Sequence, residues 1–299
     1  MTAPKSVSTS AAVPDHTTIP TTASPPPATT CALPAPAPWT DMVSIRLDPP
    51  LAHVTLQDSV HGNRITPQLR SALPEAMRQA ASHPDVRVIV LAGQPQTFCA
   101  GGTSEDLTHE SGTHSLDGWD FVRAAADCPL PVVSSVQGHA IGGGLLLALY
   151  ADAVVLSETS RYCANFLTYG FTPCLGATFL LPSVMGQMLG TEMLYSGRPY
   201  LGRELAARGA GVNITAHHLV AHKAVTLAQR MAQAPRLTLE LLKQEVVGPA
   251  RQQALSALGR EIANHAATLT SPEVRQRITA LYPVAQVPST SQPSSGARP

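Results

Sequence analysis

Two short segments rich in small residues could place backbone amides against a bound ligand. The first is Thr97–Thr103, which follows an apolar run ending at Leu91, and the second is Gly138–Gly144, which follows an apolar run ending at Val136. Small side chains let a ligand approach backbone N–H groups, and a helix that begins at such a segment adds the positive end of its dipole. Two N–H groups aimed at one point would stabilise an enolate or a tetrahedral oxyanion.

The glycine run Gly142–Gly144 has two simpler interpretations when it is taken alone. It could be a tight turn that lets a helix pack closely on a strand. It could also be a phosphate loop, but the Gly-Lys-Ser/Thr sequence of a P-loop is missing here. Two small-residue segments on successive predicted strands favour a ligand site over either alternative, because ligand sites of α/β proteins lie at the carboxyl ends of parallel strands.

Strands and helices alternate around these segments. Period-two alternation on both sides of Asp48-Pro49-Pro50 predicts a hairpin of strands over 43–47 and 52–56. Apolar runs predict further strands over 86–91, 131–136 and 153–156. Helical patterns cover 66–82 and 143–150, and then 177–187, 189–196, 201–208, 216–232, 236–246 and 250–268. The order predicts an α/β core with parallel strand pairing, followed by a helical C-terminal part.

The composition sets the limits of the folded body and of its partners. Pro, Ala, Thr and Ser dominate residues 1–40 and 285–299, which predicts disordered tails around a body over 41–284. Twenty Lys and Arg residues against 20 Asp and Glu residues give no net charge, which argues against nucleic acid or an acidic membrane surface as the partner. We expect no membrane span and no secretory signal, because no apolar run is long enough for either.

Metal and disulfide chemistry find little support in the sequence. The five cysteines are irregularly spaced with no Cys-x-x-Cys pair, so we expect reduced thiols in a cytoplasmic protein. His218 and His222 are one helical turn apart but lack a third ligand nearby, so no metal site is predicted.

The two segments, together with Asn63 and Cys128–Val133, resemble the enoyl-CoA hydratase/isomerase (crotonase) superfamily over residues 43–283. The resemblance implies a crotonase fold, with a ββα spiral core over 41–235, a helical region over 236–284 and assembly as a homotrimer. It also implies an oxyanion hole made by the amides of Ala100 and Gly143, with the substrate lying against Gly101, Gly102 and Gly142.

The departures from this family are informative. Family hydratases carry one glutamate two residues after the glycine triplet and a second further along the chain. The matching positions here are Leu146 and Phe166. Neither side chain can transfer a proton, so water cannot be activated in the hydratase manner. We therefore expect the two residues to make the substrate pocket apolar.

Longer strings narrow the resemblance. Gly101–Leu107 and Ala164–Pro173 are similar to the second crotonase of polyketide β-branching cassettes. The similarity implies decarboxylation of 3-methylglutaconyl-acyl carrier protein to 3-methylcrotonyl-acyl carrier protein, after a partner crotonase has dehydrated the precursor. Such a reaction needs an oxyanion hole, a dry pocket and one proton donor. No cofactor is implied beyond the phosphopantetheine that carries the substrate.

The proton donor implied by the resemblance is His265, since a histidine on the matching C-terminal helix lines the site in relatives. The simpler alternative is a surface histidine on an amphipathic helix. Some relatives also use a lysine after the first small-residue segment, where this chain offers only Thr108 and His109; His109 could replace it. Only three lysines occur and no cation lies between Arg87 and Arg123, which favours a carrier-protein substrate over coenzyme A, with Arg203 or Arg208 meeting the acidic carrier.

Two other functions remain open from the sequence. One is another crotonase reaction at the same oxyanion hole, as an isomerase or a thioester hydrolase. The other is a catalytically silent subunit that only binds a carrier protein, which the loss of both glutamates would allow. Retention of two unobstructed glycine-rich segments argues against the silent subunit.

Overall fold

The computed structural model describes residues 41–103 and 120–281. The chain divides into two units, Met1–Pro36 and Ala37–Pro299. The tails predicted over 1–40 and 285–299 lie outside the described residues. The helical region from residue 236 belongs to the same unit as the residues that precede it.

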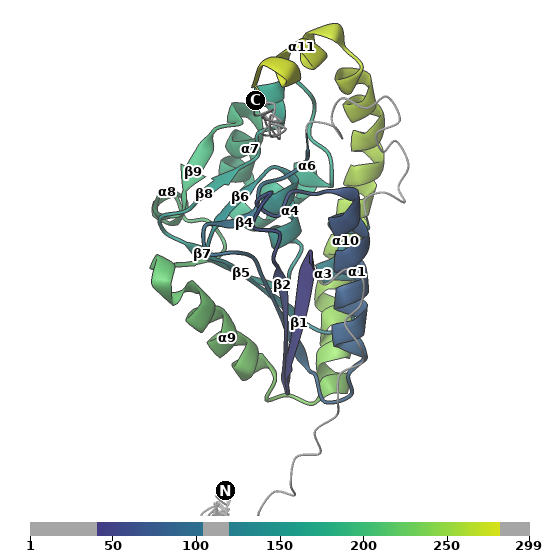
Figure 1. Ribbon diagram of the computed structural model, residues 1–299, viewed down its shortest axis with the longest axis vertical. Helices are drawn as coiled ribbons and strands as arrows, with labels where there is room; N and C mark the ends of the chain where they lie inside the picture. Colours follow the sequence, from purple (N-terminus) through teal and green to yellow (C-terminus); the bar gives the residue numbers. More distant parts are fainter. Residues whose placement is uncertain (1–40, 104–119, 282–299) are drawn as a thin grey trace, which may run out of the picture. The chain divides into compact units, whose positions relative to one another are not determined.

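Six strands form the larger sheet (Figure 1), in the order β1-β2-β3-β5-β7-β10. Their bounds are β1 Val43–Asp48, β2 Leu51–Leu56, β3 Val88–Ala92, β5 Val132–Val136, β7 Ala153–Ser157 and β10 Asn213–Thr215. The predicted hairpin is confirmed, because β1 and β2 pair antiparallel. All other pairs in this sheet are parallel. Such strands are covered on both faces, which explains their continuous apolar sequences.

A second sheet of four short strands carries the two small-residue segments. It consists of β4 Thr97–Cys99, β6 His139–Ile141, β8 Arg161–Cys163 and β9 Pro199–Leu201. The sequence did not predict these strands, because three residues are too few to show a period. Two short strands, β9 of this sheet and β10 of the larger one, lie in the region after residue 177, for which the sequence predicts mainly helices.

Helices cover both faces of the larger sheet (Figure 1). Helix α9 (Val220–Met231) packs on β3, β5 and β7 and closes a small core that includes Val88, Val133 and Ala224. On the other face α1 (Pro67–Ser82) packs on β1 and β2. That side holds the larger core, which continues into the second sheet. The described residues before 236 also include the helices α3 Ala124–Asp127, α4 Gly143–Leu149, α5 Phe166–Tyr169, α6 Ala177–Met185, α7 Gln187–Ser196, α8 Gly202–Ala207 and the 3-10 turn η2 His217–Leu219.

The C-terminal region differs from the prediction at one point. The two helices expected over 236–246 and 250–268 are a single helix, α10 (Arg236–Leu269), with Pro249 inside it, and α11 (Pro272–Leu281) follows. A proline removes one backbone hydrogen bond from a helix. Buried contacts on both sides of it, at Lys243 and Ala254, hold α10 against the core. Within the described ranges no helix is both long and apolar enough to cross a bilayer. The α/β architecture with a helical C-terminal region is confirmed.

Candidate active site

The structure brings the two small-residue segments side by side. Strand β4 pairs parallel with β6, so that Thr97 lies opposite His139 and Cys99 opposite Ala140. A Cβ atom added to Gly144 would lie 2.3 Å from the Cys99 carbonyl oxygen, and one added to Gly101 would lie 2.7 Å from the Ile141 carbonyl oxygen. The close approach explains why these positions need glycine, and it shows that the segments meet.

The Gly143 amide is well suited to bind an anion. Gly143 is the first residue of α4, and Gly142 before it adopts a positive φ of 53°. The Gly142 N–H donates to the Cys163 carbonyl over 2.7 Å, and the Gly142 carbonyl accepts from Leu145 and Leu146. A first helical residue has no carbonyl one turn earlier in the helix to bond to. Its amide also lies at the positive end of the helix dipole.

The predicted role of Ala100 disagrees with the structure. The Ala100 N–H donates to the Gly62 carbonyl over 3.0 Å, and the Gly101 N–H bonds to the Cys99 sulfur. Gly102 is the next residue of this segment. Among the described residues, no atom lies within 4 Å of a Cβ added to Gly102, so on the described side the space beside it is open to a ligand. We therefore move the candidate oxyanion donor from Ala100 to Gly102.

The turn at Gly62 and Asn63 explains why the Ala100 amide is not available to a ligand. Asn63 is fully buried with a φ of 53°, and its side-chain amide donates to the Phe98 carbonyl over 2.9 Å. The Asn63 carbonyl accepts from the Cys99 thiol over 2.9 Å. Next to it, Arg64 donates to the Gly102 carbonyl over 3.0 Å. The first segment therefore has a guanidinium beside it, supplied by Arg64 and so by a residue outside the range 87–123.

His265 is buried rather than on the surface. Its side chain lies in α10 with 7% exposure, which rules out the simpler alternative of an exposed histidine. Its Nδ1 lies 2.7 Å from the Thr172 carbonyl oxygen, so Nδ1 carries a proton and donates it. The Phe171 ring packs edge-on against the imidazole at a centroid distance of 5.2 Å, and the Phe166 ring packs on Phe171. The surroundings of His265 are therefore apolar and fix its orientation.

A short segment connects His265 to the Gly143 amide. A Cβ added to Gly143 would lie 2.8 Å from Ile65 Cδ1 and 3.0 Å from Leu175 Cδ1, so both side chains pack against Gly143. Thr172, which accepts the bond from His265, is three residues earlier in the chain. Three extended residues span at most about 11 Å. The structure therefore places the candidate proton donor and the candidate oxyanion donor at the two ends of one short segment.

The two residues at the hydratase glutamate positions are apolar and enclosed. Leu146 is fully buried in α4 and Phe166 is 4% exposed at the start of α5. Asn165, which precedes Phe166, lies over Gly142, because a Cβ added there would be 2.8 Å from Asn165 Oδ1. Both residues therefore lie next to the Gly142–Gly143 turn, and their predicted contact with a substrate stays a prediction. His109 lies outside the described residues.

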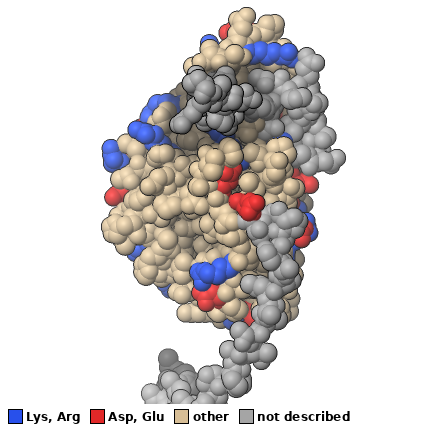
Figure 2. Space-filling model, in the orientation of Figure 1, with Lys and Arg blue, Asp and Glu red and all other residues tan. Residues whose placement is uncertain are grey.

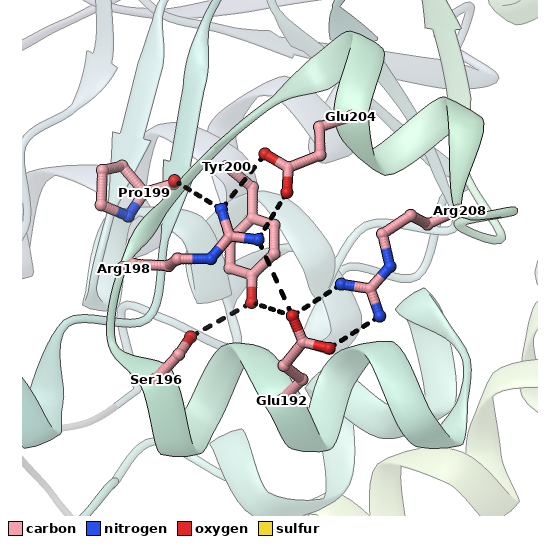
Figure 3. A network of polar contacts seen from close by, with 7 residues as sticks. All are labelled: Glu192, Ser196, Arg198, Pro199, Tyr200, Glu204 and Arg208. Carbon is pink, nitrogen blue, oxygen red and sulfur yellow. Dashed lines mark hydrogen bonds and ion pairs between the residues drawn. The ribbon is translucent and has the colours of Figure 1, made fainter.

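The predicted docking role of Arg208 is weakened by its neighbours. Figure 3 shows that its two terminal guanidinium nitrogens donate to the two oxygens of the Glu192 carboxylate, over 2.6 and 2.7 Å. Hydrogen bonds from Arg208 and Tyr200 lower the pKa of Glu192 to about 2. Arg198 is held in the same way by Glu204 and stacks on the Tyr200 ring at 3.6 Å. On the face shown in Figure 2, charged side chains of both signs are scattered over a largely uncharged surface. Arg203 is exposed and takes part in no ion pair recorded for residues 41–103 and 120–281.

Metal chemistry finds no site in the described part of the chain, where no three His, Cys, Asp or Glu side chains gather closely enough to hold an ion. The four cysteines described there, Cys99, Cys128, Cys163 and Cys174, are free and buried.

Comparison with known proteins covers nearly all of the described body. The enoyl-CoA hydratase/isomerase family model matches residues 48–282. The bacillaene synthase decarboxylase PksI of Bacillus subtilis (strain 168) is 36% identical over 239 residues, which cover 80% of this chain and 96% of that protein. The crystal structure of the ECH2 decarboxylase domain of CurF from Lyngbya majuscula is similar with a TM-score of 0.76 and 32% identity, over 81% of this chain and 99% of that one. A structure from a dehydratase/decarboxylase enzyme couple involved in polyketide β-branching gives a TM-score of 0.77 and 35% identity, over 81% and 96% of the two chains.

Proposed function

This chain belongs to the enoyl-CoA hydratase/isomerase (crotonase) family, and from that premise we propose that it is a decarboxylase of polyketide β-branching. Its similarity to PksI and to the CurF decarboxylase domain supports the reaction class. The observation that carries the proposal is the combination at the site. Two glycine-rich segments meet at the Gly143 amide, while Leu146 and Phe166 stand where a hydratase has its glutamates.

The substrate that we propose is a 3-methylglutaconyl thioester on the phosphopantetheine arm of an acyl carrier protein. The bond between the carboxylate and the γ-carbon breaks, CO₂ leaves, and the electron pair moves through the double bond onto the thioester oxygen. The resulting dienolate is stabilised by the amides of Gly143 and Gly102. Protonation of the γ-carbon then gives the 3-methylcrotonyl thioester. Apolar side chains at Leu146 and Phe166 raise the free energy of the substrate carboxylate and so favour movement of its charge onto the thioester oxygen.

His265 supplies the proton in this scheme. Its Nδ1–H is held by the Thr172 carbonyl, so the other ring nitrogen is the atom that delivers a proton and takes it up again from solvent. A histidine suits this role because its pKa lies near neutrality. The edge-on Phe171 ring keeps the imidazole in one orientation.

The partners follow from the reaction. A dehydrating crotonase must form the glutaconyl double bond before this enzyme acts, and the neighbour from a dehydratase/decarboxylase couple supports such a pathway partner. We further propose a homotrimer in the cytoplasm, with phosphopantetheine on the carrier as the substrate handle and no other cofactor.

Mass spectrometry of the loaded carrier tests the proposed function. Carrier protein bearing the 3-methylglutaconyl group is incubated with the enzyme, and we expect the acyl group to lose the mass of one CO₂. An unchanged acyl mass with measurable carrier binding would instead indicate a silent binding subunit. Release of free carrier would indicate a thioester hydrolase.

Replacement of the donor tests the mechanism. We expect His265→Ala to lower turnover roughly 10²- to 10⁴-fold while carrier binding stays unchanged. His218→Ala is the matched control, because His218 is exposed. Turnover of His265→Ala at the wild-type rate would remove His265 from the scheme.

A further inference from the structure

A second buried charged residue lies one helical turn before His265. The Glu261 carboxylate is 5% exposed and accepts hydrogen bonds from the Gly176 N–H (2.7 Å), the Thr178 N–H (2.8 Å) and the Thr178 hydroxyl (2.6 Å). Gly176 precedes α6, so the carboxylate also lies at the positive end of that helix dipole. A buried carboxylate satisfied by three donors is strongly held, since charge-assisted hydrogen bonds are the stronger kind.

Three side chains on one face of α10 form hydrogen bonds to the segment 172–178. Glu261, His265 and Thr268 are spaced by four and three residues and so lie on one side of the helix. Thr268 accepts from the Thr172 N–H over 3.1 Å, and His265 donates to the Thr172 carbonyl over 2.7 Å. Together with the bonds from Glu261, these contacts fix residues 172–178 against α10 at both ends.

The middle of this segment is strained and reaches the oxyanion site. Leu175 has a φ of 65°, an uncommon value for a residue with a branched side chain, and Gly176 follows with a φ of 73°. The Tyr150 hydroxyl donates to the Leu175 carbonyl over 2.9 Å. Strained residues persist only where their surroundings over-determine them. The Leu175 side chain packs against Gly143, so the fixed backbone also fixes a side chain beside the proposed oxyanion donor.

We propose that Glu261 is a positioning residue for the decarboxylation proposed above. By holding Gly176 and Thr178 it sets two features at once, namely the Thr172 carbonyl that fixes the His265 ring and the Leu175 side chain that covers Gly143. The inference rests on the proposed function for its kinetic consequence. Glu261 itself transfers no proton, because its carboxylate is occupied by donors of its own chain.

The tests use Glu261→Gln in the full-length enzyme. The amide keeps the size of the side chain but turns one acceptor into a donor that faces N–H groups. We expect kcat for carrier-bound substrate to fall roughly 10- to 100-fold, with KM changed less than twofold. Nitrogen-15 NMR of histidine should show the His265 ring changing from one tautomer, protonated at Nδ1, to a mixture. Glu245→Gln is the control, since Glu245 is exposed on the same helix.

A double variant separates positioning from stability. If Glu261 acts through His265, His265→Ala combined with Glu261→Gln should turn over at the rate of His265→Ala alone, because residues that act as a unit are not additive. Additive losses, or a Glu261→Gln enzyme with unchanged kcat and a single Nδ1 tautomer, would overturn the inference. Thr178→Val, which removes only the hydroxyl donor, should shift the tautomer in the same direction if Glu261→Gln does not fold.

If the proposed function is wrong, the activity and the NMR measurements will disagree. In that case the wild-type enzyme would release no CO₂, while the tautomer of His265 would still respond to Glu261→Gln.

Discussion

At the scale of single residues, the site depends on backbone groups that approach one another without side chains between them. Gly144 lies so close to the Cys99 carbonyl that a Cβ would be 2.3 Å from that oxygen, whereas no described residue has an atom within 4 Å of the same position at Gly102. The two glycines therefore have different roles. Gly144 allows α4 to pack on β4, and Gly102 leaves room for the proposed ligand.

This contrast predicts opposite outcomes for two alanine substitutions. Gly144→Ala should destabilise the protein by about 3 kcal/mol or more, because the obstructing atoms belong to backbone that cannot move aside. Gly102→Ala should change the free energy of unfolding by less than about 0.5 kcal/mol. Urea denaturation of both variants measures the difference. A Gly144→Ala protein of wild-type stability would contradict the packing described for β4 and α4.

Part of the site could be predicted from residue types alone. Small residues after two apolar runs predicted that the segments would meet, because carboxyl ends of parallel strands share one edge. The hydrogen bond from the Ala100 N–H to the Gly62 carbonyl could not be predicted. Gly62 lies in a turn with a positive φ, and no sequence pattern indicates that this turn contacts Ala100. Burial of His265 was equally hidden, because its neighbours Phe171 and Thr172 are distant in sequence.

At the scale of elements, one buried ion pair attaches α10 to the rest of the core. The Lys243 ammonium donates to the Asp152 carboxylate over 2.8 Å, and to the carbonyls of Ala125 (2.8 Å) and Leu130 (2.9 Å). Asp152 in turn accepts from the Val132 N–H at the start of β5. Burial raises the pKa of the Asp152 carboxyl, and the nearby Lys243 opposes that rise. The pair thus joins α10 to β5 and to the turn after α4.

Removal of the lysine should leave an uncompensated buried carboxylate. We expect Lys243→Met to destabilise the protein by roughly 3–5 kcal/mol, measured by urea denaturation. Lys223→Met at an exposed position should have almost no effect. Adding Asp152→Asn to Lys243→Met should recover part of the loss. A double variant no more stable than the single one would show that the lysine acts through its carbonyl contacts instead.

The longer elements were the predictable ones. Period-two alternation identified the β1–β2 hairpin, and helical periodicity identified α1, α6 and α9. Strands of three residues carry no period, so the second sheet was missed. The helix break predicted at Gly248-Pro249 was wrong. Glycine and proline disfavour a helix locally, but buried side chains on both sides of Pro249 hold α10 as one helix.

At the scale of the whole molecule, the buried thiols make the stability of the fold depend on pH. Burial raises the pKa of Cys99 to about 12 and the pKa values of Cys128 and Cys163 to about 11. These groups hold their protons more tightly in the folded state than in the unfolded chain, where the value is about 9. The stability that they contribute is complete below pH 9 and is lost as the pH rises through the folded values.

The free energy of unfolding should therefore decline above about pH 9, by roughly 1.4 kcal/mol per pH unit for each buried thiol. Guanidinium denaturation at a series of pH values measures the slope. Cys163→Ser, which keeps a donor for the Gly197 carbonyl, should reduce the slope between about pH 9 and 11. An unchanged slope would mean that other groups cause the alkaline loss of stability.

The single helix α10 has a consequence for how such an enzyme can change its chemistry. The proposed oxyanion amides are positioned by backbone packing between β4, β6 and α4, whereas the proposed donor His265 comes from a helix that begins at Arg236. A substitution at His265 alone can therefore replace the acid, while Glu261 and Thr268 still hold the segment that packs against Gly143. The fold thus keeps the acid and the anion site on separate elements, which gives a lineage a route from one enolate reaction to another.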